Sequence, residues 1–167
     1  MTNAIRILGL DPGLRRTGWG VVTVEGARLS HVAHGVVAAD EHAPLAERLL
    51  AIHRGVAEAI GLWAPQEAAV EETFVTANGS STLKLGHARA AAMLAPAAAG
   101  LPVAEYAAKV VKKALVGTGS ADKRQVAFMV ARILPTAGGP VADAADALAV
   151  AICHAHARRT RALGAAA

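Results

Sequence analysis

IRILGLDPGLRRTGWGVVTVE, residues 5–25, is the stretch that decides the fold of this chain. Its first seven residues are mostly apolar and are typical of a buried strand that ends at Asp11. Pro12 and Gly13 then turn the chain sharply, and residues 19–25 are rich in the β-branched residues of a second strand. A short connection of this kind joins antiparallel strands, so the segment predicts two neighbouring strands with Asp11 at the turn.

The rest of the chain extends these two strands into a mixed sheet. Residues 26–28, GAR, predict a hairpin turn into a third strand over residues 29–38. Apolar periodicity and turn residues then predict a helix from Pro44 to Trp63, a strand over 67–71, a helix over 78–95 that ends at Pro96, a strand over 101–106, and helices over 107–116, 121–134 and 143–161. Three successive strands followed by alternating helices and strands predict an α/β fold, with a central five-stranded mixed sheet flanked by helices on both faces.

Length and composition limit the possible function classes. A chain of 167 residues fits one domain, which we expect over residues 1–160, followed by a short Ala-rich tail over residues 161–167. Although 54% of the residues are hydrophobic, no stretch is long and apolar enough to cross a bilayer, and the first residues lack the layout of a signal peptide. The single cysteine, Cys153, excludes an intramolecular disulfide. These features predict a cytoplasmic protein with no membrane partner.

Basic residues are concentrated in one contiguous part of the chain. Residues 84–132 contain eight Lys or Arg against two acids, a net charge of +6, whereas the remainder carries nine basic and eleven acidic residues, a net charge of −2. Such a region suits a polyanion such as nucleic acid, although solvated helix faces produce the same pattern. The candidate DNA contacts within it are Lys84, Arg89, Lys112, Lys113, Lys123 and Arg124.

Four carboxylates are placed where the predicted fold could bring them together. Asp11 and Glu71 each follow a predicted buried strand, and α/β proteins place their sites at the carboxyl ends of central strands. Asp143 and Asp146 begin the last predicted helix, three positions apart and therefore on one face. Clustered carboxylates repel one another unless a cation joins them, and hard divalent cations such as Mg²⁺ or Mn²⁺ prefer oxygen ligands. The four acids therefore indicate a metal-dependent phosphoryl-transfer enzyme.

Each of these acids also has a purely structural interpretation. The side chain of Asp11 could bond its own turn, as aspartates often do. Glu71 and Glu72 point to opposite faces of an extended strand, and the pattern alone does not choose between them. Asp143 followed by Asp146 resembles a helix N-cap with a second acid in the first turn. Both negative charges would interact favourably with the helix dipole. A metal site is favoured because acids recur at the ends of successive elements.

Two further segments carry residues suited to DNA. GTGSADK, residues 117–123, lacks the Gly-Lys-Ser/Thr ending of a Walker phosphate loop. Ser120 as an N-cap, with Lys123 and Arg124 in the first helical turn, would nevertheless place a helix dipole and positive charge near a backbone phosphate. Phe74, one of only five aromatic residues, lies in a polar loop, where it could stack on an unpaired base or pack into the core.

Five motifs occur in order from about Ile5 to His156. They are ILGLDPGLRRTGWGVV, AVEETF, STLKLGHARAAA, GTGSADK and ADAADALAVAICHAH. Together they resemble the RuvC family of bacterial Holliday-junction resolvases. The DPG…TG turn is shared with actin-like ATPases and sugar kinases, whereas its combination with ETF, LKLG.AR and DAADALA is highly specific. The resemblance implies a ribonuclease H-like fold, a homodimer, and Mg²⁺-dependent nicking of four-way DNA junctions alongside junction-binding and branch-migration motor proteins.

The resemblance also implies roles for individual residues. The positions that match the family's catalytic acids are Asp11, Glu71, Asp143 and Asp146. This match favours Glu71 over Glu72. Lys112 and Lys123 match positions associated with DNA binding and catalysis, and Phe74 matches a position associated with disturbing bases at the junction.

These roles predict a two-metal hydrolysis of a DNA phosphodiester. Two Mg²⁺ ions about 4 Å apart, or Mn²⁺ in their place, would activate a water and stabilise the leaving 3′-oxygen, which leaves 5′-phosphate and 3′-hydroxyl ends. Asp11 is expected to bridge both ions, and Lys123 to offset charge on the phosphate. A two-fold dimer would supply paired cuts in matching register. The helices from Ser80 to Ala99 and from Asp143 to Arg161 both have enough small residues to pack against a partner, and we expect the interface on the first.

Two other classes compete with this hypothesis. One is a structural junction-binding protein whose acids serve only as helix caps and turn residues. The other is an actin-like or sugar-kinase ATPase, but a chain of 167 residues lacks the second lobe that encloses a nucleotide in such enzymes.

Overall fold

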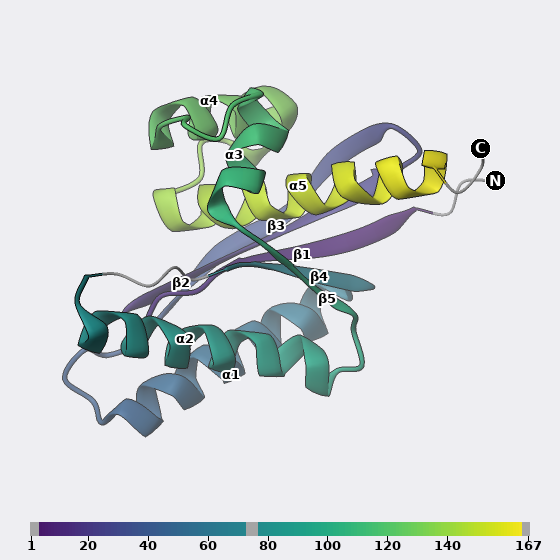
Figure 1. Ribbon diagram of the computed structural model, residues 1–167. Coiled ribbons are helices and arrows are strands. Elements are labelled where there is room, and N and C mark those ends of the chain that lie inside the picture. Colours follow the sequence, from purple (N-terminus) through teal and green to yellow (C-terminus); the bar gives the residue numbers. More distant parts are fainter. Residues whose placement is uncertain (1–3, 73–76, 165–167) are drawn as a thin grey trace.

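β1 (Ile5–Asp11) lies at the centre of the sheet in the computed structural model, which describes residues 4–72 and 77–164 (Figure 1). The strand order is β3-β2-β1-β4-β5, and the other strands are β2 (Arg16–Glu25), β3 (Arg28–Ala38), β4 (Glu67–Glu71) and β5 (Val103–Tyr106). β1, β2 and β3 pair antiparallel, whereas β4 and β5 continue from β1 in parallel. The predicted five-stranded mixed sheet is therefore confirmed.

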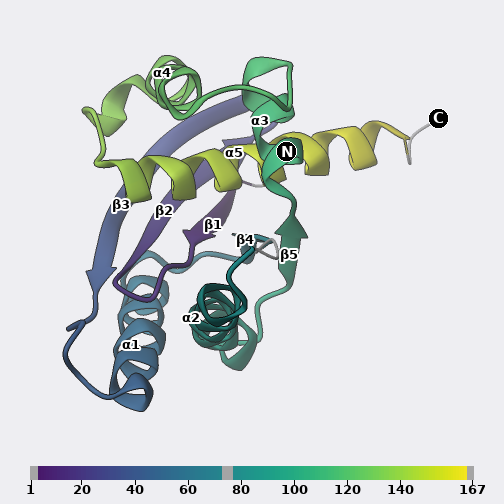
Figure 2. The same cartoon turned by 60° about the vertical axis from the view of Figure 1, so that its left-hand side comes forward.

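Helices cover both faces of this sheet. On one face lie α1 (Leu45–Trp63) and α2 (Gly79–Ala98). On the other lie α3 (Ala108–Val116), α4 (Lys123–Ile133) and α5 (Ala142–Gly164), and a short 3₁₀ helix, η1 (Pro135–Ala137), follows α4 (Figures 1 and 2). Within the described ranges, none of these helices has the length and apolar character needed to span a membrane.

Alternation along β1 divides the core in two. Leu8 and Leu10 are fully buried in the cluster formed with α1 and α2, whereas Ile7 is fully buried in the cluster formed with α3, α4 and α5. Successive side chains of a strand point to opposite faces, so Asp11 shares a face with Ile7. The central strand therefore places its terminal carboxylate beneath α5.

Two glycines let α5 rest directly on the strand backbones. A Cβ atom at Gly9 would overlap the carbonyl oxygen of Ala147 and lie 2.7 Å from the amide nitrogen of Ala151. A Cβ atom at Gly18 would overlap the backbone of Asp143 in the first turn of α5. Because Gly18 is the register partner of Asp11, this contact also fixes where α5 begins relative to the end of β1.

Several element boundaries differ from the sequence prediction, and two of these differences have a clear physical reason. β2 begins at Arg16 rather than Trp19, because the last turn residues already pair with the end of β3. The helix predicted to end at Pro96 continues to Ala98. Pro96 lies in the last turn of α2, where its missing N–H removes one bond at the end of the ladder and does not stop the helix.

A buried polar network ties α5 to the two parallel strands. Burial lowers the pKa of His154 despite its bond to Glu67, so the neutral ring donates to the Glu67 carboxylate (2.7 Å) and accepts from the Tyr106 hydroxyl (2.8 Å). Arg158 donates to Glu67 (2.9 Å), and Arg161 donates to Tyr106 (3.2 Å). The network holds the far end of α5 against β4 and β5.

Because α5 contacts the backbone of β1 at Gly9, a methyl group added at this position should strongly destabilise the fold. Gly9→Ala is expected to lower the free energy of unfolding by about 3 kcal/mol, because α5 must move away from the sheet. Gly61→Ala is the matched control: Gly61 lies in α1 with no neighbouring atom within 4 Å of an added Cβ, and alanine there should stabilise the helix by about 0.5–1 kcal/mol. Urea unfolding of both variants measures the two effects; equal stabilities would contradict this packing.

Candidate active site

The register of the sheet brings Asp11 and Glu71 side by side. β1 and β4 pair in parallel with Leu10 opposite Val70, so the next residue of each strand is one of the two acids. Both side chains line one cavity on the face covered by α5, and Glu72 does not line it. The fold therefore distinguishes the two adjacent glutamates that the sequence pattern alone left equivalent.

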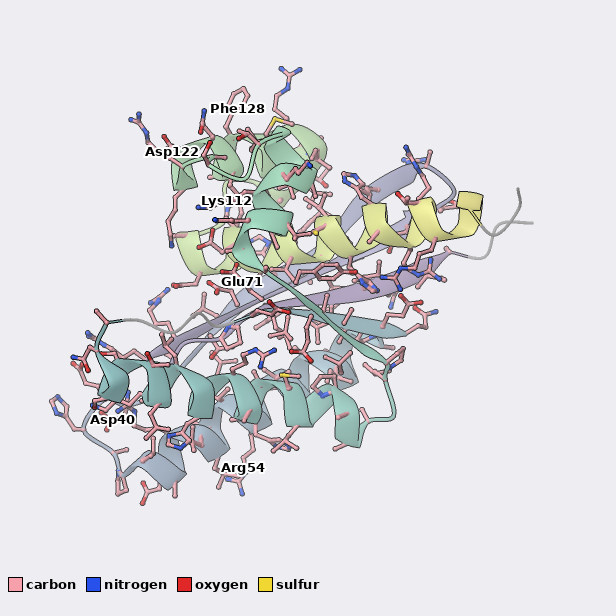
Figure 3. All side chains as sticks on the ribbon, in the orientation of Figure 1. Asp40, Arg54, Glu71, Lys112, Asp122 and Phe128 are labelled. Carbon is pink, nitrogen blue, oxygen red and sulfur yellow. The ribbon has the colours of Figure 1, made fainter. Side chains whose placement is uncertain are left out.

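Three helices complete this cavity above the two acids. Asp146 enters from α5, Lys112 from α3 and Lys123 from α4, and all three line the cavity with Asp11 and Glu71. Figure 3 shows Lys112 over Glu71, in the space between the end of the sheet and α3. We call this the acidic cavity. It combines three carboxylates with two ammonium groups at the carboxyl edge of the central strands.

A capping box sets the position of Lys123 at the start of α4. Asp122 is the N-cap: its carboxylate accepts the N–H of Gln125 (2.8 Å), and the Gln125 side chain accepts the N–H of Asp122 (2.9 Å). The prediction of Ser120 as N-cap is therefore wrong, because Asp122 adjoins the helix and makes both reciprocal bonds. Ser120 instead bonds the hydroxyl of Thr118 (3.0 Å).

Lys123 is paired with one of the three acids. Its ammonium group donates to Asp146 Oδ2 at 3.1 Å. This hydrogen bond and the charge of Asp146 raise the pKa of Lys123, with a smaller contribution from Asp11. The pair brings a positive charge to the rim of the acidic cavity.

The other two acids carry a strong electrostatic cost. Burial, followed by the charges of Asp146 and Glu71, raises the pKa of Asp11 to about 7, although Lys123 acts in the opposite direction. Burial and Asp146 also raise the pKa of Glu71, opposed by Lys123 and Lys112. The two lysines thus only partly offset the repulsion among the carboxylates.

Asp143 lies apart from the other three acids. Its carboxylate accepts a hydrogen bond from Arg16 Nε at 2.7 Å. It lines a second, open groove formed by residues 13–16 and 39–42, and does not line the acidic cavity. α5 begins at Ala142, so Asp143 lies inside the first turn and is not the N-cap considered from the sequence. From this position its negative charge still interacts favourably with the positive end of the helix dipole.

The residues of the site fit a hard divalent cation. All donor atoms of the four acids are carboxylate oxygens, the ligands that Mg²⁺ and Mn²⁺ prefer. The pKa values of Asp11 and Glu71 are raised because burial and the neighbouring carboxylates disfavour their ionised forms. An additional cation would stabilise these ionised forms. Among the described residues, no three His, Cys, Asp or Glu side chains already form a group able to hold a metal ion.

The remaining candidate DNA contacts fall into separate surroundings. Lys84, Lys113 and Arg124 are exposed on α2, α3 and α4. Arg89 is mostly buried; it donates to the carbonyl oxygen of Glu71 (3.3 Å) and forms an ion pair with Glu105. The structure thus gives Arg89 a supporting contact at the end of β4. Phe74 lies outside the described residues.

Arg16 is the residue of this region that sequence reasoning missed. The motif around Asp11 contains two adjacent arginines, and nothing in their spacing indicates that the second contacts an acid 127 positions away. The contact arises because α5 begins directly above the start of β2.

Comparison with known proteins identifies the family. Residues 7–154 match the family described as crossover junction endodeoxyribonuclease RuvC. The chain belongs to this family. RuvC proteins of Caulobacter sp. (strain K31) and Maricaulis maris (strain MCS10) are 66% and 63% identical to it, over 92% and 100% of this chain and 91% and 100% of their own lengths. It is thus a divalent-metal-dependent endonuclease that resolves Holliday junctions, as the motifs implied.

Solved RuvC structures share the fold. The chain superimposes on Thermus thermophilus RuvC, solved in complex with a Holliday junction substrate, with a TM-score of 0.87 and 38% identity over 94% of this chain and 96% of the other. The yeast mitochondrial Holliday junction resolvase Ydc2 matches with a TM-score of 0.66 at 12% identity, which speaks for the fold alone. The predicted ribonuclease H-like α/β architecture is therefore confirmed.

The electrostatic cost at Asp11 predicts a pH-dependent gain from its neutralisation. Folding raises the pKa of Asp11 from 3.8 to about 7, so the stability of the metal-free protein falls as the pH rises from about 4 to about 7. Asp11→Asn should therefore raise the free energy of unfolding by roughly 1–3 kcal/mol at about pH 8, and by less at about pH 5.

Urea unfolding in EDTA at the two pH values measures this gain. Glu58→Gln, at an exposed position of α1, removes a carboxylate outside the site and should show no comparable change. A gain that is equal at both pH values would contradict the assignment of the cost to the ionised Asp11 carboxylate.

Proposed function

We propose that Asp11, Glu71, Asp143 and Asp146 hold two Mg²⁺ ions for the paired, symmetric nicking of four-way DNA junctions. The observation that carries this proposal is the acidic cavity, in which three carboxylates meet two lysines at the carboxyl edge of β1 and β4. When bound, the ions supply Lewis acidity at the attacking water and the leaving oxygen, and Mn²⁺ could substitute for Mg²⁺.

The residues of the chain perform distinct tasks around the scissile phosphate. Asp11 is the central ligand, since its pKa responds to the charges of Glu71, Asp146 and Asp143. Lys123 lies at the rim of the cavity on the mostly exposed start of α4, from where its ammonium group can move from Asp146 to a phosphate oxygen. The products would carry a 5′-phosphate and a 3′-hydroxyl, which a ligase can seal.

The exposed basic residues supply contacts to the arms of the junction. Lys113 and Arg124 directly follow Lys112 and Lys123, the two lysines that line the acidic cavity, and Lys84 lies on α2. Phosphate contacts of this kind fix the position of DNA and carry little sequence information. We infer that Phe74 contacts the bases near the cut, and that Ser120 adds a contact at the turn before α4.

Paired cutting requires two copies of the chain, and we place their interface on α2. Leu83 and Leu94 are 63% and 60% exposed, and with Gly86 and Ala90 between them they form an apolar strip at helical spacing. A two-fold axis along this strip gives two sites in matching register. The same resolution system would include junction-binding and branch-migration motor proteins. We infer a cytoplasmic location for it, which the bacterial source of the relatives supports.

A labelled four-way junction tests the assignment of the acids. Asp11→Asn and Asp146→Asn should each reduce the rate of nicking in Mg²⁺ by at least about 100-fold, a barrier increase of about 3 kcal/mol, while junction binding is retained. Glu58→Gln should cut like the unchanged protein. If the Asp11 variant cuts normally, the acids are caps and turn residues; if the unchanged protein binds junctions without cutting them, the chain is a structural DNA-binding protein.

A supercoiled plasmid that extrudes a cruciform tests the dimer. Paired cuts convert it to a linear molecule, whereas single cuts leave nicked circles. Leu94→Glu should disrupt the strip on α2, yield a monomer by light scattering, and shift the products from linear to nicked circles. Leu62→Glu, at a position of α1 that is 68% exposed, is the matched control and should give linear product. A dimeric Leu94→Glu protein would contradict an interface on α2.

A further inference from the structure

The Asp143 side chain bonds Arg16 in a neighbouring groove, whereas the other three acids line the acidic cavity. α5 presents Asp143 and Asp146 three residues apart, on one side of the helix. Asp146 nevertheless lines the acidic cavity, whereas Asp143 lines the neighbouring groove, where Arg16 holds it. Among the causes that raise the pKa of Asp11, Asp143 is the weakest of the three acids. The Arg16 guanidinium therefore pairs with the one acid of the four that does not line the acidic cavity.

Arg16 is well placed to hold this acid firmly. It is the first residue of β2, next to Thr17, which is fully buried. The Thr17 hydroxyl donates to the carbonyl of Gly13 (3.0 Å) and accepts the Gly13 N–H (3.3 Å), which fixes the turn that carries Arg16. The guanidinium Nε then meets Asp143 Oδ2 at 2.7 Å, the length of a charge-assisted hydrogen bond. The side chains are 53% and 34% exposed, so the pair can open without disturbing the core.

We propose that Arg16 is a positioning residue that competes with the divalent cation for Asp143. This inference rests on the proposed metal site and assigns a regulation to it. A carboxylate oxygen that accepts the Arg16 hydrogen bond is not available to a cation. Metal binding to Asp143 must therefore break the ion pair with Arg16. Arg16 thereby lowers the affinity of the DNA-free enzyme for metal.

The neighbouring Arg15 provides a matched control for this role. It lies on the same turn and also forms an ion pair, to Glu41 at 3.0 Å, but it contacts none of the four acids. Both arginines line the same groove. A substitution of either one removes one positive charge and one carboxylate partner, and only the substitution of Arg16 frees a proposed metal ligand.

Isothermal titration of the DNA-free protein with Mn²⁺ tests the inference. Arg16→Gln should lower the Kd for Mn²⁺ by about three- to fivefold, as expected for an exposed ion pair that must be broken, and Arg15→Gln should leave the Kd unchanged. In an Asp143→Asn background, where the competition is gone, Arg16→Gln should have no effect on the Kd. Urea unfolding in EDTA checks that the variants are folded.

Each alternative gives a different result. If Arg16 only anchors the start of α5, Arg16→Gln will bind Mn²⁺ equally or more weakly, which overturns the inference. An equal gain in Arg15→Gln, or a gain that persists with Asp143→Asn, overturns it as well, because the effect would then be one of general charge. If the unchanged protein and Arg16→Gln both bind no Mn²⁺, the proposed metal site fails, and the inference fails with it.

Discussion

The direct contact of α5 with the backbones of β1 and β2 is the constraint on which the rest of the structure depends. Gly9 and Gly18 have no side chain, and any Cβ at these positions would overlap the backbone of α5. The helix therefore lies closer to the sheet than packed side chains would allow. Its first turn consequently stands over the end of β1, and Asp146 reaches the cavity that contains Asp11 and Glu71. A small helix–sheet separation is what makes an acidic site possible here.

This closeness has an electrostatic consequence. Three carboxylates in a partly buried cavity destabilise the folded protein, as the raised pKa values of Asp11 and Glu71 indicate. The fully buried residues of α5, such as Leu148 and Ile152, and the network around His154 stabilise the same helix along its remaining length. The fold thus supports a repulsive site at one end of α5 with apolar packing and satisfied polar contacts further along it.

The sequence predicted the sheet and most helices because their signals are local. Apolar runs end at Asp11 and Glu71, and turn residues separate the elements, so the elements themselves follow from short-range rules. The choice between Glu71 and Glu72, by contrast, depends on the register of β4 on β1. The failures have non-local or competing causes. The N-cap of α4 is Asp122 and not Ser120, because Asp122 makes a reciprocal pair of hydrogen bonds with Gln125. Helix α2 continues past Pro96, because a proline in the last turn affects only the end of the hydrogen-bond ladder. The Arg16–Asp143 pair depends on tertiary packing that no local pattern encodes.

The two acids at the start of α5 pair with different basic residues in different surroundings. Asp146 is paired with Lys123 at the acidic cavity. In the proposed mechanism, Lys123 remains beside the site when this pair opens and can then contact a phosphate. Asp143 is paired with Arg16 on the other side, in an open groove. The Lys123–Asp146 pair therefore puts an ammonium group at the cavity, whereas the Arg16–Asp143 pair holds a carboxylate in the groove beside it. Four unpaired carboxylates would repel the phosphate backbone of DNA before any cation was bound. If these acids hold the metal as proposed, pairing two of them with Lys123 and Arg16 lowers that repulsion in the metal-free protein.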